Sequence, residues 1–280
     1  MAETEAGAAA DPGSPWTDLD RPPLSVSRLR RALTGSAVWS DIRVLATTQS
    51  TNADVSRAAA DGAAEGLVVF AEQQSAGRGR LDRRWESPPR AALLVSVLLR
   101  PPVPVVRTPL LPLLAGVAVA EALRTTAAVE AVLKWPNDVL VDGRKLAGVL
   151  VERTPDGAVV VGIGLNVTTR RSELPVPVAT SVAMEGGISD REPLAKELLR
   201  ALERRYVAFC AADGTPGSIL PAYVAICETI GKRVTVEVPG GAVVDGVATS
   251  VDDHGMLVVR GDDGHERVWS AGDVTHVREG

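Results

Sequence analysis

Three strand-length apolar runs joined by tight turns constrain the fold of this chain most. The runs are Val139–Val141, Leu146–Val151 and Val159–Val167, and their connectors are Asp142-Gly143 and Pro155-Asp156-Gly157. Asp, Gly and Pro favour the backbone conformations of short turns, and short turns join antiparallel neighbours. The segment is therefore predicted to form a β-meander.

Further apolar patterns extend this meander into a larger domain. Leu67–Ala71 and Leu93–Leu99 are apolar throughout, which is typical of strands buried on both faces. A Ser189-x-x-Glu192 capping box predicts a helix that runs to about Phe209. Other elements are expected at Val26–Leu33, Leu110–Thr125 and Ile219–Ile230 as helices and at Ile42–Ala46 as a strand. Helices packed on a mixed sheet make the expected class α+β over residues 24–230.

The two ends of the chain have different patterns. Residues 1–23 are rich in Ala, Gly, Pro and acids without periodicity, which predicts a disordered tail. From Gly231 onward, short alternating runs are separated by turn residues. The runs are Val234–Val238, Val243–Thr249, Leu257–Arg260 and Glu266–Trp269. Residues 231–280 are therefore expected to form a small β-barrel.

Composition excludes several classes of protein. The net charge of -5 argues against wholesale nucleic-acid binding, which needs clustered cations. Cys210 and Cys227 stand apart, so neither a disulfide framework nor a thiolate zinc site is indicated, and a reducing cytoplasm fits best. The N-terminus lacks a basic region, and Pro or charge interrupts the longest apolar stretches before they reach membrane-spanning length. We therefore expect neither secretion nor a membrane span.

The histidines restrict the available chemistry. His254, His265 and His276 all lie near the C-terminus. Chemistry upstream must therefore rely on Lys, Arg, Asp, Asn and backbone groups.

Two segments suggest binding of anions. Ser50-Thr51-Asn52 precedes an Ala-rich helical stretch, and Thr51 with Asp54 has the spacing of a helix cap, where anions are favoured. Between two core strands, the polar segment Gln73–Arg90 contains Gly77-Arg78-Gly79-Arg80 and continues to Trp85. Glycines let backbone N–H groups approach an anion, and arginine binds phosphate or carboxylate bidentately. By itself, the loop is equally well explained as a solvated surface or a nucleic-acid contact.

Three further segments are weak signals individually. Lys134-Trp135-Pro136-Asn137-Asp138 is by itself best explained as a turn before a strand. Gly143–Gly148 places Lys145 at the start of an apolar strand, where a lysine usually extends to solvent at the edge. Gly162–Asn166 has small residues at alternate positions, which indicates close approach of a ligand or backbone, or else a β-bulge.

In this order and spacing, these five segments closely resemble the bacterial biotin protein ligase family (biotin-acetyl-CoA-carboxylase ligase), over roughly residues 42 to 170. The terminal barrel resembles that family's SH3-like C-terminal domain. The resemblance implies a class II aminoacyl-tRNA synthetase/biotin ligase-like catalytic domain. It also implies an enzyme that makes biotinyl-5'-AMP from biotin and MgATP and then transfers biotin to a lysine of the biotin carboxyl carrier domain of an acyl-CoA carboxylase.

The resemblance also implies residue roles. Lys145 would reach the biotin carboxylate and the adjoining phosphate oxygen, Arg80 the phosphate, and Asn137 with Asp138 the nucleotide and Mg²⁺ side. Apart from the resemblance, Asp138 is the expected base for the acceptor amine, because a free lysine is protonated near neutrality and no histidine lies nearby in the sequence. No tightly bound metal is expected, because Mg²⁺ would arrive with ATP. Biotin would be bound by Ser50, Thr51, Asn52, Gln74, Gly77, Arg78, Gly79, Arg80, Lys145, Gly148 and Gly162. ATP would be bound by Arg78, Arg80, Trp85, Asn137, Asp138, Lys145 and Asn166.

Two departures from the family pattern and two alternatives remain. Asp82 stands where the family loop usually has glycine, which affects the expected loop closure. About forty tail-like residues are too few for the winged helix-turn-helix of the bifunctional ligases, so a ligase without a repressor domain is expected.

The alternatives are a lipoate or octanoate ligase or transferase and an RNA-binding protein, although the barrel segment is not basic and offers only Trp269 for base stacking.

Overall fold

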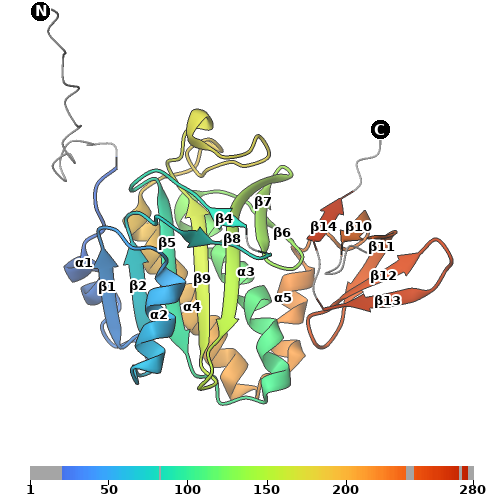
Figure 1. The fold of residues 1–280 in the computed structure, drawn as a ribbon, viewed down its shortest axis with the longest axis horizontal. Helices are drawn as coiled ribbons and strands as arrows, with labels where there is room; N and C mark the ends of the chain where they lie inside the picture. Colours follow the sequence, from blue (N-terminus) through green and yellow to red (C-terminus); the bar gives the residue numbers. More distant parts are fainter. Residues whose placement is uncertain (1–20, 82, 238–242, 271–272, 277–280) are drawn as a thin grey trace, which may run out of the picture.

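A seven-stranded sheet forms the centre of the larger domain (Figure 1). The structure, a computed structural model, describes residues 21–81, 83–237, 243–270 and 273–276. β1 and β2 are parallel and the other neighbours are antiparallel, so the sheet is mixed. In sheet order the strands are β1 (Asp41–Leu45), β2 (Leu67–Ala71), β5 (Ala92–Leu99), β9 (Val159–Asn166), β8 (Arg144–Arg153), β7 (Asp138–Val141) and β6 (Val132–Lys134).

The predicted meander is confirmed as β7, β8 and β9. Asp142 and Gly143 join β7 to β8 with φ angles of 48° and 70°, and two successive positive φ angles are what a two-residue hairpin turn requires. β6, which the sequence analysis missed, pairs with β7 and extends the meander by one strand. The tight β7–β8 turn brings the start of β7 opposite the interior of β8.

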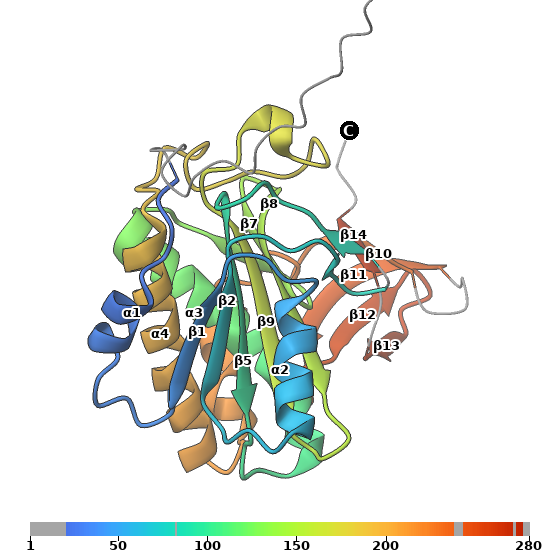
Figure 2. The ribbon, with the colours of Figure 1, turned by 60° about the vertical axis from the view of Figure 1, so that its left-hand side comes forward.

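The sheet is covered on both faces (Figures 1 and 2). On β2, Val68 and Phe70 belong to the large core cluster with α3 and α4, whereas Leu67 and Val69 belong to the smaller cluster under α2. This confirms the expectation that the uninterrupted apolar runs are buried on both sides. The α-helices are α1 (Val26–Ala32), α2 (Thr51–Ala60), α3 (Leu111–Ala122), α4 (Arg191–Ala211) and α5 (Leu220–Val224), with shorter turns at Val105–Leu110, Leu123–Ala127, Arg171–Glu173 and Pro216–Ser218.

The helical stretch Val105–Ala127 is long and apolar enough to cross a membrane by length and composition. In the fold it contains α3, in which ten of the twelve residues are buried. α3 packs beside α4 and against β6, β7, β8 and β9 of the sheet, as a core helix of a globular domain does. Its apolar composition is accounted for by this burial.

Two helix predictions are wrong in part. The helix expected over Ile219–Ile230 ends at Val224, because the following backbone bonds to the edge strand β6: Leu133 N donates to Ile226 O, and Glu228 N donates to Leu133 O. The expected Ser189 cap of α4 is replaced by Asp190, whose side chain accepts from Glu192 N. Both errors concern hydrogen-bond partners that the local pattern does not specify.

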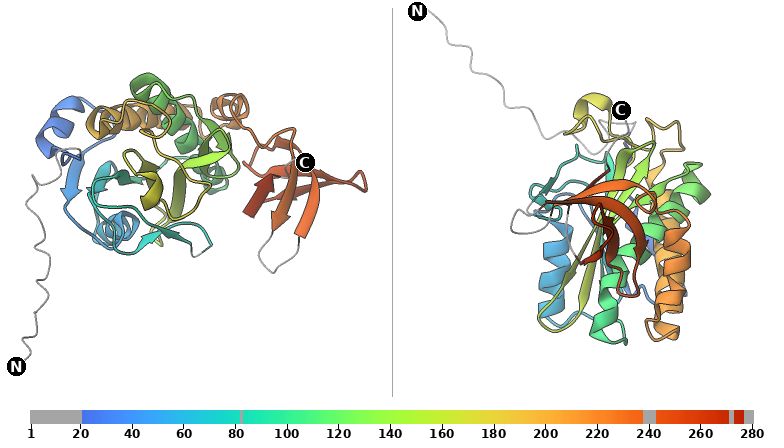
Figure 3. Two further views of the ribbon diagram at one scale, coloured as in Figure 1. Left: turned by 90° about the horizontal axis from the view of Figure 1, so that it is seen from above. Right: turned by 90° about the vertical axis from the view of Figure 1, so that its right-hand side faces the viewer.

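The C-terminal residues form a five-stranded antiparallel sheet compatible with the expected SH3-like barrel, beside the β6–β7 end of the large sheet (Figure 3). Trp135 joins the two parts, because its Nε1 donates to Gly255 O at 2.9 Å. Its N donates to Thr229 Oγ1 at 3.0 Å, in the segment that leads into β10. The expected α+β class with a terminal barrel is thus confirmed. The strands are β10 (Arg233–Glu237), β11 (Val243–Val251), β12 (Leu257–Gly261), β13 (Glu266–Trp269) and β14 (Asp273–His276), of which β14 was missed.

The predicted domain limits remain predictions. The limit between residues 230 and 231 falls between α5 and β10. Most of the predicted tail lies outside the described residues, as does Asp82.

Candidate active site

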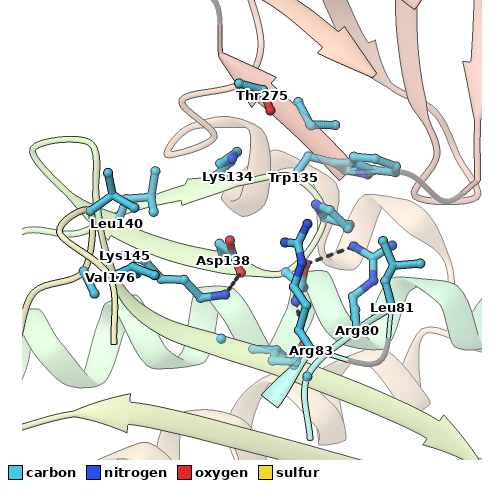
Figure 4. A pocket seen from close by; sticks show the side chains of 18 of the residues that line it. Arg80, Leu81, Arg83, Lys134, Trp135, Asp138, Leu140, Lys145, Val176 and Thr275 are labelled. Carbon is cyan, nitrogen blue, oxygen red and sulfur yellow. Dashed lines mark hydrogen bonds and ion pairs between the residues drawn. The ribbon is translucent and has the colours of Figure 1, made fainter. Parts of the chain in front are cut away.

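A cavity of about 1280 Å³ lies between β7 and β8, the arginine-rich loop and the barrel (Figure 4). Lys134, Asp138 and Lys145 come to it from the sheet, and Thr275 from β14. Among the described residues that line it, eight are Lys or Arg and three are Asp or Glu. A cavity with this excess of cations in an acidic chain favours an anionic ligand.

Lys145 and Asp138 form an ion pair in this cavity, with 2.6 Å between Nζ and Oδ1. The backbone of the lysine is held by the segment at Val178 and Thr180: its N donates to Val178 O, and its O accepts from Thr180 N. Only 35% of the lysine side chain is exposed. The side chain points into the cavity. The alternative in which this lysine extends to solvent at the sheet edge is therefore wrong.

The indole of Trp85 lies over the glycines of β8 and β9. A Cβ atom at Gly164 would lie 2.5 Å from Trp85 Cε2, and one at Gly148 would lie 3.4 Å from Cζ3. The ring centroid is 6.0 Å from Lys145 Nζ. The sequence predicted close approach of a ligand or backbone at Gly162–Asn166, and the structure places an aromatic side chain over Gly164. Trp85 Nε1 is buried without an acceptor in the described part of the chain, which marks a polar position of the site.

The arginine-rich loop is a short hairpin, which we call the lid: β3 (Gly77–Arg78) pairs with β4 (Arg84–Trp85). Gly79 N donates to Arg83 O at 2.7 Å and closes the hairpin. Arg80 reaches across to the sheet, where its Nη1 donates to Asn137 Oδ1 at 3.0 Å (Figure 4). Asn137 Nδ2 in turn donates to Val149 O. The lid thus covers the cavity and is bonded to its floor.

The residues at the start of α2 form a separate, buried polar group. Ser50 is the N-cap, with its side chain accepting from Ala53 N, so the predicted cap by Thr51 is wrong. Thr51 N donates to Gln74 Oε1 at 2.7 Å. The first amide of the helix is therefore engaged by a side chain, and Ser50, Thr51 and Asn52 are each 4% exposed.

Two members of this group were missed by the sequence analysis, Ser96 on β5 and Glu152 on β8. Ser96 Oγ lies 2.7 Å from Thr51 Oγ1 and 2.6 Å from Asn52 Oδ1, and Asn52 Nδ2 donates to Glu152 Oε2 at 2.7 Å. Gly162 leaves room for the asparagine, since a Cβ atom there would lie 1.9 Å from Asn52 Oδ1. A single hydroxyl within a strand buried on both faces was the available signal for Ser96.

The predicted site residues thus fall into two adjoining sets. The cavity brings together Arg78, Gly79, Arg80, Trp85, Asn137, Asp138, Lys145, Gly148 and Asn166. The predicted residues Ser50, Thr51, Asn52, Gln74, Gly77 and Gly162 do not line it. Gly77 belongs to the lid, and the others lie beside the cavity under the lid, because Asn52 and Trp85 stand over Gly162 and Gly164 on the same face of β9. Asn166 is buried and donates through Nδ2 to Thr180 O.

The donor groups near the cavity are suited to a metal ion that arrives with a ligand. In the described ranges no group of three or more His, Cys, Asp or Glu residues is arranged to hold a metal ion. Asp138 offers one carboxylate in the cavity. One carboxylate together with phosphate oxygens is a common arrangement for Mg²⁺ that arrives with a nucleotide.

His276, at the barrel side of the cavity, is expected to make the free energy of unfolding of the protein depend on pH. Burial, followed by the charges of Lys134 and Lys232, lowers its pKa to about 4, although Glu228 opposes the shift. Between pH about 6.5 and about 4 the unfolded chain binds a proton that the folded chain does not, so the free energy of unfolding falls as the pH falls through this window. We expect a loss of about 1 to 3 kcal/mol by pH 4. Urea unfolding at pH 7.5 and 4.5 should show a smaller loss for His276→Gln, and equal losses would contradict this assignment.

Comparisons with known proteins agree on one family. Residues 43–168 match the Biotin/lipoate A/B protein ligase family, and residues 229–277 match the Biotin protein ligase C terminal domain. The biotin--[acetyl-CoA-carboxylase] ligase of Mycobacterium tuberculosis is 44% identical over 272 residues, covering 94% of this chain and 100% of that protein. The bifunctional ligase/repressor BirA of Bacillus subtilis is 34% identical, covering 81% of this chain and 71% of that protein. The structure of the Aquifex aeolicus biotin protein ligase in complex with biotin and ATP has a TM-score of 0.70 at 26% identity, covering 86% of this chain and 100% of that chain.

Proposed function

Because the chain belongs to the biotin protein ligase family, we propose that the cavity around Lys145 activates biotin with MgATP and passes it to a lysine of an acceptor protein. The observation that carries the proposal is the Lys145–Asp138 pair in a cation-rich cavity beneath an arginine-bearing lid. A reaction that joins a carboxylate to a phosphate must bring two anions together. Fixed cations lower their repulsion.

The proposed reaction has two steps. An oxygen of the biotin carboxylate attacks the α-phosphorus of ATP, the bond to the β-phosphate breaks, and pyrophosphate leaves with biotinyl-5'-AMP remaining. The acceptor amine then attacks the carbonyl carbon, and AMP leaves with the bonding electrons. The amine must lose a proton, and we propose that the carboxylate of Asp138, 2.6 Å from Lys145 Nζ, receives it.

The structure supports distinct roles for the two sets of residues. The backbone of Lys145 is held by two hydrogen bonds, and its side chain would bind the biotin carboxylate and the adjoining phosphate oxygen. Arg80 on the lid would bind the phosphate, with Trp85, Asn137 and Asn166 on the nucleotide side. The buried polar group at the start of α2 would bind the biotin head group through Ser50, Thr51, Asn52 and Gln74, with the backbone of Gly77–Gly79, Gly148 and Gly162 approaching the ligand.

We propose that the acceptor is the biotin carboxyl carrier domain of an acyl-CoA carboxylase in the cytoplasm. This follows from the relatives named as ligases of acetyl-CoA carboxylase. Leu81 and Val176, both exposed, line the cavity (Figure 4). These apolar side chains are suited to contact a protein surface.

Biotin-dependent exchange of radioactive pyrophosphate into ATP tests the proposal. We expect exchange with biotin and Mg²⁺ and none with lipoate or octanoate in place of biotin. Chelation of Mg²⁺ should abolish it. Exchange supported by lipoate or octanoate would instead assign the chain to the second branch of the matched family, and the absence of exchange with all three acids would overturn the proposal.

Replacing Arg80 should separate adenylate formation from adenylate retention. Arg80→Gly removes the guanidinium that bonds the lid to Asn137, and a charge-assisted hydrogen bond of this kind corresponds to about tenfold or more in a dissociation rate. The variant should still form biotinyl-5'-AMP but release it about tenfold faster, which labels lysines of an unrelated bystander protein. Rapid-quench assays with a bystander present measure both quantities. Arg43→Gly is the matched control, because Arg43 is exposed on the edge strand β1. Tight retention of the adenylate by Arg80→Gly would show that the role of Arg80 is elsewhere.

A further inference from the structure

Glu152, near the end of β8, connects the buried polar group to the lid. A single carboxylate oxygen, Oε2, accepts from Asn52 Nδ2 at 2.7 Å and from Arg78 Nη2 at 2.9 Å. Asn52 is buried, whereas half of the Arg78 side chain is exposed. The same oxygen therefore joins an interior amide to a cation at the surface.

On the interior side, Glu152 determines the orientation of the Asn52 amide. Asn52 Oδ1 faces the Ser96 hydroxyl at 2.6 Å, and its Nδ2 faces the carboxylate and, at 3.4 Å, Leu150 O. Reversal of the amide would place Oδ1 against acceptor oxygens that have no hydrogen to donate. Because Gly162 leaves just enough space for this side chain, the asparagine has little freedom to move away. The carboxylate thus fixes which end of the amide faces each neighbour.

On the outer side, Glu152 holds one strand of the lid. Arg78 belongs to β3, the first strand of the hairpin, while Arg80 at the tip bonds to Asn137 across the main cavity. A second cavity of about 610 Å³ lies beside β3 and is lined by Arg78, Leu150 and Glu152. Where this cavity borders the lid, the Arg78–Glu152 ion pair crosses from β3 to β8.

We propose that Glu152 is a positioning residue that couples the biotin pocket to the lid. It keeps the Asn52 amide in the orientation that the pocket needs, and it ties the base of the lid to the sheet through Arg78 while the adenylate is bound. Glu152 itself does not contact the reacting atoms. The inference rests on the proposed function and adds a residue that links two parts of the same site.

Two substitutions separate the two contacts. Glu152→Gln keeps an oxygen that can accept from Asn52 but removes the charge that pairs with Arg78. It should leave the KM for biotin within about twofold and raise the adenylate release rate about threefold, the scale of a partly exposed ion pair. Glu152→Ala removes both contacts, so the KM for biotin should also rise about tenfold, as expected when a buried amide loses a charged acceptor.

The salt dependence of the adenylate release rate distinguishes the proposed ion pair from a role of Glu152 in stability alone. Adenylate release from the unmodified protein should accelerate between 20 mM and 500 mM NaCl because screening weakens the Glu152–Arg78 pair. Release from Glu152→Gln should be fast at both concentrations. Glu197→Gln is the matched control, because Glu197 also pairs with an exposed arginine, Arg204, on α4.

The outcomes are decisive in either direction. Release rates and salt dependence of Glu152→Gln equal to those of the unmodified protein would overturn the coupling, as would an unchanged KM for biotin in Glu152→Ala. If Glu152→Ala fails to fold, the measurements on Glu152→Gln decide alone. Pyrophosphate exchange by the unmodified protein is measured first. Its absence would refute the proposed function, whereas normal exchange with unaffected Glu152 variants would refute this inference only.

Discussion

Lys145→Ala is expected to slow adenylate formation and biotin transfer alike, each by about a hundredfold or more, the usual scale for loss of one group that stabilises developing charge. Lys145 is fixed by backbone bonds to Val178 and Thr180, and its Nζ lies in the cavity beside Asp138. Negative charge grows at the phosphate and then at the carbonyl oxygen near the same point. One rigid cation therefore serves both steps.

Single-turnover measurements of each half-reaction test this expectation. The second step is measured by supplying purified biotinyl-5'-AMP. Lys196→Ala, which removes a lysine of the i,i+4 pair with Glu192 on α4, is the control and should leave both rates unchanged. Adenylate formation by Lys145→Ala at a near-normal rate would show that another cation of the cavity has the role assigned to Lys145.

Gly162→Ala is expected to raise the KM for biotin on the order of a hundredfold, because displacing a positioning group by about 1 Å has effects of this size. A methyl group at this position would lie 1.9 Å from Asn52 Oδ1, so the buried asparagine would have to move by more than 1 Å to regain a normal contact. The hydrogen bonds of Asn52 to Ser96 and Glu152 cannot both survive such a shift.

A neighbouring glycine makes the test specific. Gly164→Ala places a methyl group 2.5 Å from Trp85, so it should raise the KM for ATP more than the KM for biotin. Gly217→Ala is the control, because its Cβ would meet nothing within 4 Å. Thermal unfolding of each variant shows whether overpacking has also reduced stability. Equal effects of Gly162→Ala and Gly164→Ala on both substrates would contradict the division of the site into a biotin side and a nucleotide side.

Local patterns predicted much of the fold. The limits of β2 and β13 agree with those read from the sequence, because apolar periodicity and turn residues act over a few positions. The same locality explains why the Lys145–Asp138 pair lies within reach of sequence reasoning: a two-residue turn joins β7 to β8 and brings the two motifs together. The motifs and their order were also sufficient to indicate the family, which the comparisons confirm.

Hydrogen bonds between distant segments decided the rest. Asn52 meets Ser96 across 44 positions and Glu152 across 100, and no short pattern records such pairings. For the same reason the chain after Val224 bonds to β6 and does not continue as a helix, and β14 is recognisable only beside β10. The sequence by itself determined which residue types were available and which strands were neighbours through tight turns. Only the tertiary structure decided which polar groups satisfy one another in the interior, because each buried donor takes the acceptor that packing places beside it.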